Sequence, residues 1–447
     1  MGSMKKFYFI FLLFTVTVNS LAYSLPQSFV AMEDGYYIFC LISYVTLLFL
    51  STYNKNEITA LLVFQAPFGL FILGRFIGHY LDSGLKIESI DFFHSVNLSS
   101  QEIIRYLSIY MIFFNMVFMG YLLPPLKARK ASFKLEIDSD IITFFSYFII
   151  FISIIGIFLV LKDLYSTVSQ FGYAALYIVK KENANDSSSI FITLLLVTIG
   201  LAAKENCRRP LNILMIVLFS YSFALLFMGA RGPMMTYIIL WLWLYKKNIN
   251  IIKLGVVALI ILACVQYLSA MMRTTDSQYN IFAKILYDMG TTFIVLPFGS
   301  FVSDWPNVAL IQNFIPMASR LASLFIDFNP YEANLANYLG FHLNQDLYWK
   351  GVGLGWTVVL DFSIYALGNI ILLSLYAMIF GIVLRNLDSF SSTNTIKYGL
   401  ATTVILPLSF LYRSGLFSVV PLAVYFLMMI LILSFISTLF RRINFGN

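Results

Sequence analysis

The sequence is poor in charge, histidine and cysteine, and these shortages exclude several classes of protein. Of its 447 residues only 11% are charged and 60% are apolar, a composition that an ordinary soluble globule does not have. The 3 cysteines, Cys40, Cys207 and Cys264, are too widely spaced for a disulfide framework or a zinc site.

The motifs of several soluble enzyme classes are also missing. The chain contains no His-Glu-x-x-His pair, no phosphate-binding loop and no Gly-x-Ser-x-Gly elbow, and its Asp-x-Asp sequence, Asp138-Ser139-Asp140, lies on the predicted inner side. Metal-dependent hydrolysis and cytosolic nucleotide chemistry are therefore not expected. We predict a protein without a metal site and without a bound cofactor.

Long apolar runs are what the chain has in abundance. Several approach about 20 residues, the length that crosses a bilayer as a helix. We predict an all-α polytopic membrane protein with about 12 transmembrane helices, in a single integral membrane domain over residues 1–447. Phe7–Leu25 lacks a clean cleavage site and is predicted to remain as the first helix. The predicted spans cover residues 7–25, 36–53, 58–78, 104–123, 141–161, 190–203, 211–228, 233–245, 251–270, 363–384, 397–412 and 416–440.

Lysine and arginine collect on one side of these spans. In cytoplasmic membranes that side faces the cytoplasm. With this assignment both termini are cytoplasmic, and the inner side carries 17 of the 29 basic residues but only 6 of the 22 acids. The net charge of +7 is therefore a signal of topology, and nucleic acid is not expected as a partner.

Two predicted outer segments are long enough to be functional. The first covers residues 162–189, where Leu164–Val179 has apolar residues at roughly helical spacing and is predicted to lie on the membrane surface. The second covers residues 271–359, between the ninth and tenth spans. Its apolar stretch Gly290–Phe301 is too short to span, so we predict a re-entrant or interfacial segment.

Four arginines fall on the predicted outer side: Arg231, Arg273, Arg320 and Arg413. Guanidinium forks match phosphate oxygens, so these residues are candidates for binding the pyrophosphate of a lipid-linked substrate. Arg231 precedes Pro233 at the expected N-terminus of a helix, where free amides favour anions. Arg413 stands between two apolar spans with almost no loop, where a charge needs a wet cavity or a partner. The alternative for each arginine is a structural role at the membrane interface.

Two candidates for a general base follow from the same outer region. Asp361 comes after the glycine run Gly351–Gly355, near the predicted start of the tenth span. His342 lies in the long outer segment, which we predict to be a loop at that point. Each side chain can accept a proton from a hydroxyl, and each has a structural alternative: an ion pair for Asp361 and simple surface exposure for His342.

The order of these motifs resembles the Wzy-type oligosaccharide repeat unit polymerases that build O-antigens and capsules. Five features carry the resemblance over roughly residues 140–440. The matching residues are Met228–Gly232 entering an apolar helix, Met272-Arg273, Ile315-Pro316, Gly353-x-Gly355 followed by Asp361 and Gly368, and Arg413 between the last spans. The family pattern has glutamate where this chain has Asp361, so a strict catalytic role at this position does not follow.

The resemblance implies a metal-independent glycosyltransferase of the GT-C type in the bacterial inner membrane, with a periplasmic site. Its substrates would be oligosaccharide repeat units linked to undecaprenyl pyrophosphate, and a chain-length regulator would be a candidate protein partner. Aromatic residues of the outer segment are candidates for stacking on sugars, or else form an interfacial belt: Trp305, Tyr331, Tyr348, Trp349 and Trp356.

Other functions remain open on the sequence. An O-antigen ligase would share the large outer segment, and a flippase or transporter for lipid-linked oligosaccharides would share the hydrophobicity. Flippases tend to show two similar halves and charges at the middle of the membrane. This sequence shows no internal repeat, and its charges lie at the ends of the spans.

Overall fold

A computed structural model describes most of the chain. The described residues are 2–52, 58–124, 137–171, 187–204, 207–228, 232–245, 279–350, 352–389 and 396–444. Two of the predicted phosphate-binding arginines, Arg231 and Arg273, and the predicted ninth span, 251–270, lie outside them.

Among the described residues, 7 helices are long and apolar enough to cross a membrane. Helices of this length reach about 30 Å at roughly 1.5 Å per residue. They are α1 (Gly2–Ser24), α3 (Glu33–Thr52), α6 (Ser100–Leu122), α7 (Ser139–Phe171), α10 (Arg208–Phe227), α20 (Ile370–Ser389) and α22 (Val420–Asn444).

Shorter apolar helices fill the spaces between these spans. The helices α4 (Ala60–Phe71) and α5 (Gly74–Leu81) meet at a bend of 42° and count as one broken span or a re-entrant pair, which raises the number of candidate spans to 8. Three more are α9 (Ser187–Lys204), α11 (Gly232–Leu244) and α21 (Ile396–Leu408). An all-α polytopic membrane protein is thereby confirmed, whereas the predicted count of about 12 spans stays a prediction.

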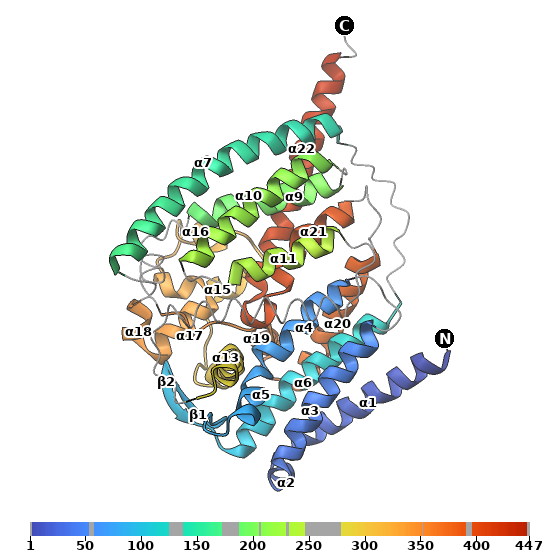
Figure 1. The fold of residues 1–447 in the computed structure, drawn as a ribbon, viewed down its shortest axis with the longest axis vertical. Helices are drawn as coiled ribbons and strands as arrows, with labels where there is room; N and C mark the ends of the chain where they lie inside the picture. Colours follow the sequence, from blue (N-terminus) through green and yellow to red (C-terminus); the bar gives the residue numbers. More distant parts are fainter. Residues whose placement is uncertain are drawn as a thin grey trace.

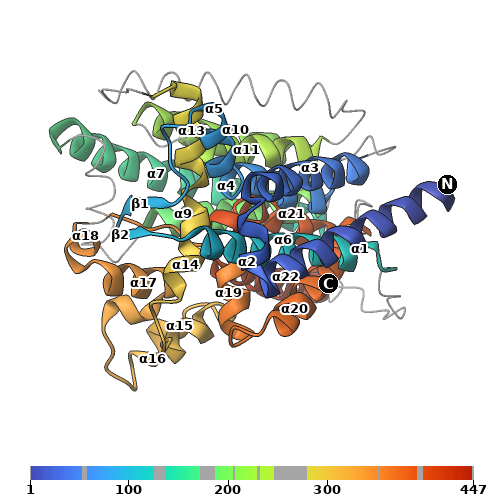
Figure 2. The same cartoon turned by 90° about the horizontal axis from the view of Figure 1, so that it is seen from below.

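The ends of the chain lie on one side of the helical layer. The N-terminal end of α1 and the C-terminal end of α22 point to the same side (Figure 1). The opposite side carries the short helix α2 (Pro26–Val30), the strands β1 (Ser89–Phe92) and β2 (His94–Asn97), and two helices of the long segment, α17 (Leu335–Leu343) and α18 (Gln345–Trp349). In the view from below, the N-terminus lies on the side away from β1, β2 and α18 (Figure 2).

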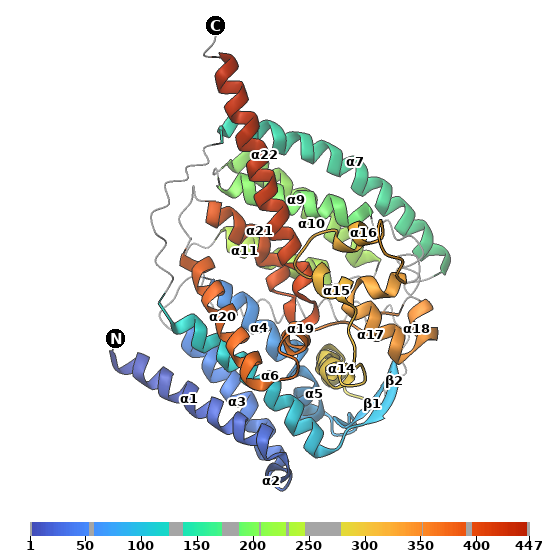
Figure 3. The same ribbon diagram turned by 180° about the vertical axis from the view of Figure 1, so that it is seen from behind.

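The long predicted outer segment folds into short helices. Residues predicted to be a re-entrant stretch form the 3₁₀ helix η1 (Gly290–Ile294) and α14 (Val295–Gly299), and most of their side chains are buried within the protein. The remaining elements of this segment are α13 (Ile281–Met289), α15 (Asn307–Gln312), α16 (Ala318–Ala322), η2 (Pro330–Ala333) and α19 (Val358–Tyr365). The helices α15 to α18 lie together on the same side of the molecule as α14 (Figure 3).

Three details differ from the predictions. Residues 162–171 of the first outer segment continue α7 as one unbroken helix. The tenth span begins at Ile370, because Leu367 and Gly368 adopt positive φ angles of 52° and 71° that end α19. Asp361 therefore lies on a separate short helix and not at the start of a spanning one.

The helical fold contains one small sheet that the sequence did not predict. β1 and β2 pair as an antiparallel hairpin, with Ser89 opposite Asn97. The buried Arg75 of α5 supports it, because Nη2 donates hydrogen bonds to the carbonyls of Ile87 and Ser89 at 3.0 and 2.7 Å. Its guanidinium also stacks on the ring of Tyr287, 4.4 Å from the centroid.

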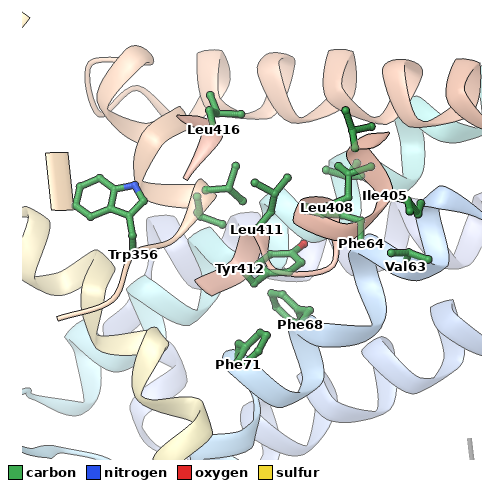
Figure 4. Close-up of a cluster of buried hydrophobic side chains, with 14 of the residues drawn as sticks. Val63, Phe64, Phe68, Phe71, Trp356, Ile405, Leu408, Leu411, Tyr412 and Leu416 are labelled. Carbon is green, nitrogen blue, oxygen red and sulfur yellow. The ribbon is translucent and has the colours of Figure 1, made fainter. Parts of the chain in front are cut away.

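The core positions the segment that carries Arg413. The fully buried Tyr412 stacks on Phe64 at a centroid distance of 4.7 Å and meets Phe68 edge to face at 5.1 Å (Figure 4). Its hydroxyl donates a hydrogen bond of 2.8 Å to Oε1 of the buried Gln65. Because Tyr412 is anchored on all these sides, the backbone of the next residue, Arg413, has a fixed place.

Candidate functional site

A cavity of about 190 Å³ lies between the segment predicted to be outside and the residues that follow Tyr412. Its walls come from segments far apart in sequence: α17 and α18, residues 352–356, and residues 413–417. The glycine run and Arg413, which the sequence singled out separately, therefore meet at one site.

The glycines of the run keep the cavity open. A Cβ atom added to Gly353 or Gly355 would meet no atom within 4 Å, so the space beside each of them is empty. Gly355 also has a φ of 83°, which side chains other than glycine rarely adopt. Trp356 follows directly and is buried, with its ring edge to face against Trp305 at 5.8 Å.

Arg413 is the cation of this cavity. It ends the 3₁₀ helix η3 (Leu411–Arg413), whose other two residues are buried, while the Arg413 side chain is exposed. The guanidinium carbon lies 5.6 Å from the centroid of the Phe71 ring. The arrangement holds a planar, permanently charged group at a solvent-accessible wall, where it is able to form two parallel hydrogen bonds to phosphate oxygens.

Asp361 joins two segments that build the cavity to the end of α15. The side chain is fully buried, at 0% exposure. Oδ1 accepts hydrogen bonds from Trp356 Nε1 at 2.8 Å and from Asn313 Nδ2 at 3.1 Å, and Oδ2 accepts one from the backbone N–H of Leu416 at 2.7 Å. The carboxylate therefore ties the glycine run and the Arg413 segment to the end of α15.

Burial changes the protonation of this carboxyl group. Removal from water raises the pKa of Asp361 to about 7, and the hydrogen bonds from Leu416, Trp356 and Asn313 oppose that rise.

The close packing around Asp361 explains the glycine at position 415, because a Cβ atom there would lie 2.7 Å from Asp361 Oδ2 and 2.8 Å from the Trp356 ring. The sequence analysis did not single out Gly415, since its constraint comes from a contact across the fold.

His342 lies on a helix and not in the irregular loop that we predicted. It is in the last turn of α17, where Asn334 caps the first turn by accepting from the N–H of Ala336 at 2.9 Å. The exposed imidazole lies 3.0 Å, through Nδ1, from the carbonyl oxygen of Tyr338, and its centroid is 4.1 Å from the Tyr338 ring. His342 does not line the cavity, although Asn337 and Gly340 of the same helix do.

The remaining predicted arginines are not assembled with Arg413 in the described structure. Arg320 is exposed on α16 and does not line the cavity. Arg231 and Arg273 lie outside the described residues. Within the described parts of the chain, no group of three histidine, cysteine, aspartate or glutamate residues is arranged to hold a metal ion.

Five cavity residues escaped the sequence analysis: Ala336, Asn337, Gly340, Ser414 and Phe417. Asn337 stands on the cavity side of α17, and Phe417 closes the wall beside Arg413. An isolated asparagine and a phenylalanine in an apolar chain carry no signal by themselves. Only their place relative to Arg413 and the glycine run identifies them.

Comparison with known proteins identifies a family for this chain. A family model described as O-antigen polysaccharide polymerase Wzy matches residues 5–443, nearly the whole chain. No curated protein and no solved structure matched the chain.

Proposed function

The chain belongs to the O-antigen polysaccharide polymerase Wzy family, and from that premise we propose that it joins lipid-linked oligosaccharide repeat units into a polysaccharide. The lipid carrier in this proposal is undecaprenyl pyrophosphate, and the site faces the periplasm of a bacterial inner membrane. The observation that carries the proposal is the cavity that combines Arg413 with the open glycine run in a membrane protein of this family.

The proposed reaction is a glycosyl transfer of the GT-C type. A hydroxyl oxygen of the incoming repeat unit attacks the anomeric carbon of the sugar that carries the growing chain. The bond from that carbon to the pyrophosphate oxygen breaks, and the lipid pyrophosphate leaves with the electron pair. The proton of the attacking hydroxyl passes to a base. Because negative charge grows on the leaving group, a fixed guanidinium beside it stabilises the transition state more than the ground state.

Arg413 takes the place of a metal ion in this proposal. Its neighbours Leu411 and Tyr412 are buried, so the backbone that carries it is fixed before substrate binds. A preorganised cation needs no rearrangement at the moment of reaction, which is what makes such groups effective. Arg320, Arg231 and Arg273 remain candidates for the same pyrophosphate.

Asp361 and His342 remain the two candidates for the base. The carboxylate of Asp361 is fully buried and already accepts three hydrogen bonds, which supports a positioning role. The imidazole of His342 is exposed on α17, five residues along the helix from the cavity residue Asn337. A sugar hydroxyl bound across α17 would lie closer to His342, whereas one bound deep in the cavity would lie closer to Asp361.

The sidedness of this proposal is testable by labelling. Ser319 belongs to the segment that we place outside, and Ser132, outside the described residues, belongs to a loop that we place inside. In a background without native cysteines, an impermeant maleimide applied to intact spheroplasts should label Ser319→Cys and spare Ser132→Cys. The reverse pattern would put the cavity on the wrong side for a periplasmic reaction.

Elongation by the purified protein tests the function itself. The full chain, in detergent, is given a lipid-linked repeat unit with no energy source and no lipid A core acceptor, and the products are separated by length. We expect a ladder of longer chains that persists in excess EDTA. If chains lengthen only when a lipid A core acceptor is added, the result favours a ligase. Transport across vesicles without elongation favours a flippase. Loss of the ladder in EDTA would contradict metal independence.

A further inference from the structure

The α17 wall of the cavity carries groups suited to a sugar rather than to a phosphate. We propose that this wall binds the sugar ring bonded directly to the pyrophosphate of the lipid-linked substrate. The inference rests on the proposed polymerase function and adds a binding subsite to it. Besides Asn337 of α17, the subsite includes Tyr348 of α18 and Gly353 and Trp356, which follow α18.

Asn337 supplies the polar group of this subsite. Its backbone N–H is occupied in the helix cap, where it donates to Asn334 Oδ1 at 3.3 Å. Its side-chain amide lines the cavity and has no hydrogen-bond partner among the residues that the structure describes. An amide offers donors and an acceptor on one rigid group, which is the combination that neighbouring sugar hydroxyls require.

Aromatic rings form the apolar part of the subsite. Tyr348 and Trp356 line the cavity and are only 6% and 3% exposed, so the surroundings hold their rings in place. Tyr348 is fixed edge to face against Phe341 at a centroid distance of 5.6 Å. Pockets for small polar ligands combine apolar and aromatic walls with a few placed polar groups, as here.

The size of the cavity limits what fits. Its volume of about 190 Å³ corresponds to roughly six water molecules at about 30 Å³ each. That space suits one sugar ring. Gly353 lines the cavity and an added Cβ atom there would meet no atom within 4 Å, so a larger side chain at this position has room to reach toward a bound ring.

The position of Arg413 determines which sugar of the substrate lies in this subsite. It lines the same small cavity as Asn337, so a ligand that fills the cavity reaches both. In the substrate only one sugar is covalently bonded to the pyrophosphate. A pyrophosphate at Arg413 therefore places that sugar, and not a distal one, against α17.

Binding of two probes to the full-length protein in detergent separates the sugar from the phosphate. The probes are farnesyl pyrophosphate and a panel of farnesyl pyrophosphoryl monosaccharides carrying glucose, galactose, N-acetylglucosamine or N-acetylgalactosamine. We expect wild-type protein to bind at least one glycosylated probe more tightly than farnesyl pyrophosphate. A difference of roughly two- to tenfold is the contribution expected from each net hydrogen bond.

Two variants with matched controls complete the test. Asn337→Ala should abolish the preference for the glycosylated probe and leave the affinity for farnesyl pyrophosphate unchanged, whereas the exposed Asn307→Ala should change neither. Gly353→Val should also abolish the preference by filling the cavity. Its control is Gly35→Val, because Gly35 likewise has no atom within 4 Å of an added Cβ atom.

The outcomes distinguish this inference from the proposed function. Equal affinity of wild-type protein for all probes, together with normal elongation of a lipid-linked repeat unit, would overturn the subsite and leave the polymerase proposal intact. A preserved preference in both Asn337→Ala and Gly353→Val would also overturn it. Absence of elongation by the wild-type protein would instead overturn the function on which the subsite rests.

Discussion

Replacing Asp361 by asparagine should loosen the segment that carries Arg413. The two side chains have the same size, but an amide presents an acceptor on one side and a donor on the other. Asp361 receives one hydrogen bond on Oδ2 from Leu416 and two on Oδ1 from Trp356 and Asn313. In either orientation the NH₂ group of the asparagine therefore faces at least one of these donors.

The magnitude follows from the number of donors left without an acceptor. A buried donor without a partner costs about 1–3 kcal/mol. In the better orientation only the hydrogen bond from Leu416 is lost. The free energy needed to open the 411–418 segment should therefore fall by about 1–3 kcal/mol. An energy of this size corresponds to roughly a five- to 150-fold change in an equilibrium. Affinity for farnesyl pyrophosphate should fall with it, because Arg413 belongs to this segment.

Hydrogen exchange of the purified protein measures the effect directly. At pH 8, where most Asp361 is ionised, backbone amides of residues 411–418 should lose protection in Asp361→Asn. The control is Asp304→Asn, which changes an exposed acid of the same outer segment and should leave that protection unchanged. Unchanged exchange at 411–418 with a fall in kcat of about 10²–10⁴-fold would refute the positioning role and identify Asp361 as the base.

The same carboxyl group should make stability depend on pH. Its pKa in the folded protein is raised to about 7 from its usual 3.8, so the unfolded chain loses this proton first as pH rises. The contribution to stability is therefore full below about pH 4, declines between about pH 4 and pH 7, and is constant above that range. The melting temperature of the wild-type protein should fall as pH rises through this range, and the melting temperature of Asp361→Asn should fall less.

Three further substitutions test other parts of the structure. Arg413→Lys keeps the charge but loses the guanidinium fork, so elongation should fall at unchanged protein abundance; normal elongation in both the Lys and Ala variants would make the residue structural. Arg75→Leu removes the buried donor for carbonyls of residues 86–89, and the melting temperature should fall; an unchanged value would show that the hairpin does not depend on it. Gly381→Leu would force a side chain against the α6 backbone and should reduce the yield of monodisperse protein, whereas Gly35→Leu should not.

Local features of the sequence determined the class of the protein. Apolar runs report whether a segment can cross a membrane, because the bilayer requires about 20 apolar residues in a helix whatever the neighbouring helices are. Most predicted spans accordingly coincide with helices of the structure. The hairpin at 89–97 escaped prediction because its support is Arg75, a buried charge whose carbonyl partners are identified only by the fold.

The residues of the candidate site also fall into two groups, those that the sequence indicates and those that only the fold brings together. Arg413 and the glycine run were detectable in the sequence, since a charge between apolar spans and closely spaced glycines are both locally unusual. The role of Asp361 was not, because its partners Asn313 and Leu416 lie 48 and 55 residues away along the chain. Asn337 gave no signal until tertiary structure placed it in the cavity with Arg413. Composition and spacing thus determined a membrane protein and indicated Arg413, whereas packing across the fold decided which residues share a cavity with it, because such contacts leave no local pattern in the sequence.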